Sequence, residues 1–220
     1  MMPPVKGWPE DSQLTNVAAL GLAPHSGWAA VVGIGAADAH LRVLVRDRIE
    51  MADPGPHGPR QPYHAVEGLP IEEAERRLAA YEAEAGRRAH EALERIAKRL
   101  VEGGHRLIGL GILESAGRKG SSLAATLASH ALIHTADGDH FRKAIALAAA
   151  RLQLAVSRVR SRDLLTEAVT VVGRPPESLS QSIREWGREV GPPWGADQKA
   201  AALLAWVMLA RAPAGRRSTG

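Results

Sequence analysis

The chain has 220 residues, of which 45% are apolar and 24% are charged, and its formal net charge is +4. This composition is typical of one globular domain with a sizeable core, and it excludes a disordered or fibrous chain. No apolar run approaches the ~20 residues that a membrane-spanning helix needs. Cysteine is absent, which excludes disulfides and thiolate chemistry. We therefore expect a cytoplasmic protein without a membrane partner.

The stretch from Asn16 to Gly35 predicts a central pair of strands. Residues 17–22 form a short apolar run, which favours a buried strand, and residues 28–32 resume a strand-like pattern. Pro, Ser and Gly within residues 23–27 predict the turn between them. A third strand is expected at residues 41–49, where arginines share one face, as at the edge of a sheet.

A long helix and a buried strand are predicted next. Residues 52–69 are rich in Pro and Gly and form a long loop, a kind of segment that is often functional. Residues 71–102 combine an apolar stripe with Glu placed four positions before Arg or Lys, which predicts an amphipathic surface helix. Residues 106–114 are almost continuously apolar and predict a strand that is covered on both faces.

The second half predicts four helices and one strand. We expect helices at 123–133 and 139–152, separated by a segment whose Thr135, Asp137 and Asp139 are candidate N-caps. A strand at 154–160 and helices at 177–190 and 196–210 complete the series. The expected domain covers residues 15–211, between flexible tails at 1–14 and 212–220. The element order predicts an α/β fold with a mixed five-stranded sheet, three antiparallel strands plus two parallel strands, and helices on both faces.

Three segments resemble the ribonuclease H-like superfamily, and within it the RuvC-type Holliday-junction resolvases. The segment LGLAPHSGWAAVV at 20–32 resembles the strand–turn–strand opening of that family. Residues 107–114 resemble its fourth strand, which ends in a catalytic Glu. Residues 171–206 resemble its C-terminal basic segment, helix and acid-led last helix. The resemblance implies an RNase H-like, RuvC-type sheet and a relation to nucleic acid.

The same resemblance implies an acidic site that is incomplete in this chain. In the family, four carboxylates hold two divalent ions for phosphodiester hydrolysis. Glu114 and Asp197 match two of these carboxylates and are the expected catalytic and metal-binding residues. Ala23 and Trp194 stand where the other two acids belong. His25, two residues after Ala23, is the third candidate catalytic residue.

The expected cofactor is a divalent metal ion (Mg²⁺, Mn²⁺ or Zn²⁺), or none. A site that combined His25, Glu114 and Asp197 with a later histidine would suit Zn²⁺ or Mn²⁺ better than Mg²⁺. The alternative is that His130 and His134, four residues apart, share a helix face for packing. Glu114 could likewise cap a loop or pair with a cation, and Asp197 could serve the dipole of the last helix.

The candidate nucleic-acid-binding residues are Arg118, Lys119, Arg174 and Lys199. Arginine clusters at 158–162 and 184–188 are compatible with a phosphate-rich partner, or with an ordinary solvated surface. Three functions stay open. They are a RuvC-like nucleic-acid-binding protein without two-metal chemistry, a metal-dependent hydrolase with a remodelled His/Glu/Asp site, and a non-enzymatic module or homodimer that uses Trp8, Trp186 and Trp194 as exposed contacts.

Overall fold

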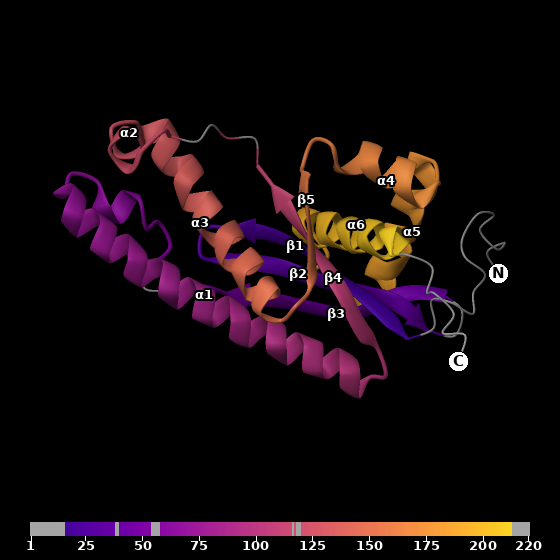
Figure 1. Cartoon of the computed structure of the whole chain (residues 1–220). Helices are drawn as coiled ribbons and strands as arrows, with labels where there is room; N and C mark the ends of the chain where they lie inside the picture. Colours follow the sequence, from indigo (N-terminus) through magenta and orange to yellow (C-terminus); the bar gives the residue numbers. More distant parts are fainter. Residues whose placement is uncertain (1–15, 38–39, 54–57, 116, 118–119, 213–220) are drawn as a thin grey trace, which may run out of the picture.

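A computed structural model describes residues 16–37, 40–53, 58–115, 117 and 120–212 of the chain (Figure 1). The strands are β1 (Val17–His25), β2 (Trp28–Ala37), β3 (His40–Glu50), β4 (Arg106–Glu114) and β5 (Ala155–Arg160). The helices are the short 3₁₀ segment η2 (His64–Val66), α1 (Ile71–Glu102), α2 (Leu123–Leu127), α3 (His130–Arg151), α4 (Leu164–Val172), α5 (Pro176–Val190) and α6 (Ala196–Arg211).

The five strands form one mixed sheet in the order β3-β2-β1-β4-β5. β1, β2 and β3 pair antiparallel, whereas β4 and β5 are added parallel to β1. β1 therefore lies in the centre, and seven of its nine residues are buried. The predicted fold class is confirmed. The carboxyl ends of β1, β4 and β5 meet at the same edge of the sheet, which is called the C-terminal edge below.

Two helical layers cover the sheet, one on each face (Figure 1). On one face, Leu20 and Leu22 of β1 pack with Leu93 of α1 and with Phe141 and Ile145 of α3. The alternate β1 residues face the other layer, which is formed by α4, α5 and α6. This alternation is the two-residue period of a strand. Side chains of one strand therefore reach two separate apolar cores.

The α6 layer packs directly against two strands at positions where each carries glycine. A Cβ atom on Gly21 of β1 would lie 1.9 Å from the Ala201 carbonyl oxygen. A Cβ atom on Gly111 of β4 would lie 2.4 Å from Cγ of Leu204.

The opening turn is shorter than predicted. The prediction of a turn over residues 23–27 is wrong at its start, because Ala23, Pro24 and His25 belong to β1 and pair with β2. Only two residues separate the strands, and Gly27 supplies the positive φ (84°) that a tight hairpin requires. His25 is consequently the last residue of a strand.

The predicted break within residues 123–152 is also displaced. Thr135, Asp137 and Asp139 lie inside the continuous helix α3 rather than at its N-cap. Their side chains have partners other than an orphan helix N–H: the Thr135 hydroxyl donates to Ala131 O, and Asp137 accepts from Tyr63 N. The helix α4 was not predicted at all. No helix in the described part of the chain is both long and apolar enough to span a membrane.

Candidate functional site

The three predicted catalytic residues come from three elements that end or begin at the C-terminal edge. His25 is the last residue of β1, Glu114 is the last residue of β4, and Asp197 lies in the first turn of α6. Leu22 pairs with Ile112, so Glu114 is level with the residue before His25. In open α/β sheets this edge is where ligand sites are usually found.

The structure brings His25 and Asp197 together. His25 Nε2 lies 3.0 Å from Asp197 Oδ1, and both side chains are partly exposed, at 43% and 37%. The imidazole also stacks on Trp28, with ring centroids 4.4 Å apart and planes inclined by 12°. Arg48 lies over the Trp28 ring, at 3.9 Å from its centroid. A carboxylate and a stacked ring thus orient an accessible imidazole, an arrangement that can serve proton transfer.

Glu114 has a different set of partners. Arg158 Nη1 of β5 donates to Glu114 Oε1 at 2.7 Å, and Ser161 N donates to the Glu114 carbonyl at 3.0 Å. Leu113 packs with the α6 layer, so strand alternation directs Glu114 toward the face that α3 covers. Glu114 and the His25–Asp197 pair therefore lie toward opposite faces of the sheet.

A buried arginine behind Glu114 was missed in the sequence. Arg142 of α3 is 8% exposed, and its Nε donates to the Leu113 carbonyl at 3.2 Å. Burial lowers the pKa of Arg142, while the carboxylates of Asp139 and Glu114 oppose that shift. The only signal in the sequence was a cation on the apolar face of a predicted helix. Glu114 is thus flanked by two arginines.

Two of the four predicted nucleic-acid-binding residues can be placed. Lys199 is exposed in the first turn of α6. Arg174 lies between α4 and α5 with its guanidinium 5.4 Å from the centroid of the Trp206 ring, and burial lowers its pKa. Arg118 and Lys119 lie outside the described residues.

Comparisons with known proteins give structural matches only. No protein-family model matches the chain, and no curated protein matches its sequence. Among solved structures, RuvC of Thermus thermophilus in complex with a Holliday junction substrate is 14% identical over 87% of this chain and 92% of that one, with a TM-score of 0.48. The arrangement of the mixed five-stranded sheet is the one that the sequence resemblance implied.

Two other solved structures are similar over much of the chain. The yeast mitochondrial Holliday junction resolvase is 10% identical, with a TM-score of 0.40 over 90% of this chain and 81% of its own. An Aquifex aeolicus PPX-GPPA enzyme is 9% identical, with a TM-score of 0.36 over 70% of this chain and 40% of its own. These similarities are in the spatial arrangement of the helices and strands.

The two positions that lack the expected acids are packed into apolar surroundings. Ala23 is 2% exposed and belongs to the core between the sheet and α6. Trp194 is half-buried, its Nε1 donates to the Ile183 carbonyl at 3.0 Å, and its ring occupies the space beside Gly187. Both residues stabilise the structure by packing.

One expectation about the tryptophans is wrong. Trp186 is 5% exposed rather than a surface contact, because its indole packs against Trp206 and donates to the Leu41 carbonyl. Trp194 is only partly exposed, and Trp8 lies outside the described residues. His130 and His134 do share one face of α3, where their rings are in contact, and both are exposed.

Proposed function

We propose that this protein binds structured or branched nucleic acid through its RuvC-like fold and does not cleave it by two-metal catalysis. The observation that carries the proposal is the state of the four positions matched to acids in the family. Two of them, Ala23 and Trp194, are packed residues without a carboxylate. The other two, Glu114 and Asp197, are each paired with a cationic or imidazole side chain of the protein itself.

Electrostatics supports this interpretation. A Mg²⁺ ion needs hard oxygen ligands in near-octahedral geometry, and a pair of ions needs carboxylates that converge. The Arg158–Glu114 ion pair already compensates one carboxylate, and Asp197 faces the other side of the sheet edge beside His25. A metal ion at Glu114 would lie beside the guanidinium of Arg158, and the repulsion between the two positive charges opposes its binding.

Cations at the same edge support binding to phosphates. Arg158 and Arg160 of β5 are exposed, and Arg160 lies level with Glu114 in the sheet. Lys199 is exposed in the first turn of α6. Arginine and lysine side chains at such positions bind phosphate oxygens without reading the base sequence. We therefore assign the binding surface to Arg160 and Lys199, with Arg174, Arg118 and Lys119 as further candidates.

The test compares a four-way DNA junction with a linear duplex of equal length over about 50 to 200 mM salt. We expect the logarithm of the binding constant to fall linearly with the logarithm of the salt concentration. Arg160→Gln and Lys199→Gln should each weaken binding and reduce the salt slope by about 1. Arg151→Gln is the matched control. Arg151 is exposed at the C-terminal end of α3, and β5 begins just after it and runs the length of the strand before it reaches Arg160 at the C-terminal edge. Absence of binding at low salt would overturn the proposal.

The second candidate function is a metal-dependent hydrolase with a remodelled site. The oriented and accessible His25–Asp197 pair favours it. Incubation of junction DNA with Mg²⁺, Mn²⁺ or Zn²⁺ separates the two functions. Cleavage that is lost in both His25→Gln and Asp197→Asn would establish the hydrolase and exclude the non-cleaving protein. Intact DNA with all three ions would eliminate the hydrolase.

A further inference from the structure

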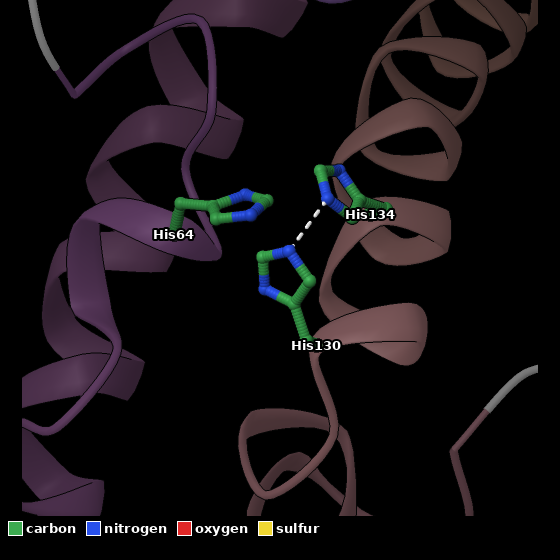
Figure 2. A group of neighbouring side chains, drawn as sticks. All are labelled: His64, His130 and His134. Carbon is green, nitrogen blue, oxygen red and sulfur yellow. Dashed lines mark hydrogen bonds between the residues drawn. The ribbon is translucent and has the colours of Figure 1, made fainter.

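Three histidines from two distant segments meet at one place on the surface. His64 lies in η2, and His130 and His134 lie one turn apart at the start of α3 (Figure 2). One ring nitrogen from each residue lies within 4.8 Å of the others. Nε2 of His130 and Nε2 of His134 are 3.0 Å apart. Figure 2 shows the three rings pointing toward one another across the gap between η2 and α3.

A buried carboxylate fixes the orientation of His64. Asp137 is 2% exposed, and its Oδ2 lies 2.5 Å from His64 Nδ1. Its other oxygen accepts from the Tyr63 backbone N–H at 2.7 Å. Since the carboxylate is an acceptor, the neutral imidazole of His64 carries its proton on Nδ1 and presents the lone pair of Nε2 to a metal ion. Metal-binding histidines commonly donate their second nitrogen to a carboxylate in this way, which fixes the tautomer and raises ligand basicity.

The spacing of the nitrogens suits a transition-metal ion. In tetrahedral coordination with Zn–N bonds of about 2.0–2.1 Å, two ligand nitrogens are roughly 3.3 Å apart. The observed 3.0 Å between His130 and His134 is close to that value, and a ring nitrogen of His64 lies within 4.8 Å of both. His130 and His134 are exposed, so core packing gives no reason for the convergence.

We propose that His64, His130 and His134 form a binding site for Zn²⁺, with Asp137 as the residue that positions His64. Three imidazoles select a borderline metal such as Zn²⁺ over the hard ions Mg²⁺ and Ca²⁺. Three protein ligands leave one coordination position, which water occupies on the exposed side of the cluster. The ion joins the segment before α1 to the start of α3.

This site is separate from the candidate edge site. His134 precedes Arg142 by two turns of α3, a rise of about 12 Å, and Arg142 is the residue that contacts the end of β4. The His25–Asp197 pair lies toward the opposite layer. The metal site therefore stands whether or not the proposed nucleic-acid function is correct.

The experiment uses the full chain without a polyhistidine tag, stripped with a chelator and titrated with Zn²⁺ against a chromophoric competitor. We expect one tightly bound Zn²⁺ per chain. The double variant His130→Ala/His134→Ala should lose at least about 100-fold in affinity, and Asp137→Asn should lose about 10–100-fold. His40→Ala, which removes an exposed histidine at the start of β3, is the matched control and should bind as the parent does.

A loss of Zn²⁺ binding in the double variant should not be caused by misfolding. His130 and His134 are exposed in α3, and Ala is the best helix former, so the double variant should keep its circular dichroism spectrum. Co²⁺ substitution gives a second measurement, since tetrahedral nitrogen ligation produces visible absorption bands that the double variant should lack. The proposal is overturned if stoichiometric Zn²⁺ binding is absent, or if the double variant binds as tightly as the parent.

Discussion

Ala23 tests whether the C-terminal edge of the sheet can still accommodate a metal-binding carboxylate. Ala23→Asp places a carboxylate in the apolar core between β1 and α6, where the native residue is 2% exposed. An unpaired buried charge costs about 3–5 kcal/mol, so we expect the free energy of unfolding in urea to fall by that amount. Ala23→Asn, with the same shape and no charge, should cost less. If Mg²⁺ selectively stabilised the Asp variant, the new carboxylate would lie at a metal site, and the apolar packing described for position 23 would be contradicted.

His140 gives a pH dependence whose sign can be worked out. Burial lowers the pKa of His140, although its hydrogen bond to the Tyr81 backbone and the nearby Glu82 and Asp137 raise it again in part, and Lys143 lowers it. Below about pH 6.5 the unfolded chain takes up a proton that the native chain resists. This contribution to stability is therefore present at neutral pH and is lost as pH falls toward the folded pKa.

The effect is measured by urea unfolding of the chelator-treated protein between pH 5 and 8. His140→Gln should flatten the pH profile by up to about 1.4 kcal/mol per pH unit below the unfolded pKa. Other titrating groups are common to both proteins, so the difference between the two profiles isolates His140. Parallel profiles would show that His140 is protonated equally in the folded and unfolded states.

At the scale of elements, the contact of β1 with α6 depends on one glycine. Gly21→Ala would put Cβ within 1.9 Å of Ala201 O and 2.8 Å of Ala205 N, and backbone atoms of a packed helix cannot move aside cheaply. Overpacking usually costs 1–3 kcal/mol, and we expect about 3 kcal/mol or more here. Gly86→Ala in α1 is the matched control, because its Cβ meets nothing within 4 Å.

The control substitution should change the free energy of unfolding in the opposite direction. Replacing an unconstrained helical glycine by alanine stabilises by roughly 0.5–1 kcal/mol. Urea unfolding of both variants therefore tests whether the close approach of α6, rather than a general effect of alanine, sets the stability. Equal changes in the two variants would contradict the packing shown for Gly21.

Elements with a strong local pattern could be predicted from the sequence, and elements defined by distant contacts could not. The bounds of α1 and β4 match the prediction because an amphipathic stripe and a continuous apolar run each determine their element locally. α3 was divided because Thr135 and Asp137 resemble caps, whereas Asp137 actually accepts hydrogen bonds from the segment before α1. α4 was missed because it is short and lies between arginine-rich segments.

The same limit applies to the sites. The sequence placed His25, Glu114 and Asp197 at one sheet edge, but it could not show that Arg158 pairs with Glu114 or that alternation turns Glu114 toward α3. The histidine cluster was hidden because His64 lies in a Pro- and Gly-rich loop without periodicity. His64 is held beside α3 by its hydrogen bond to Asp137, a residue 73 positions away in the sequence.

At the scale of the whole molecule, Zn²⁺ binding should stabilise the folded chain, because its ligands come from two segments that are far apart in the sequence. Zn²⁺ held by His64, His130 and His134 binds only when the segment before α1 and the start of α3 are together, as in the native chain. A ligand at 100 times its dissociation constant then adds about 2.7 kcal/mol, which for a domain of this size is an increase in melting temperature of roughly 5–10 °C. Differential scanning calorimetry with Zn²⁺ measures it, chelator should reverse it, and Mg²⁺ should not reproduce it. The His130→Ala/His134→Ala variant should not respond, and an equal increase in that variant would place the stabilising ion elsewhere.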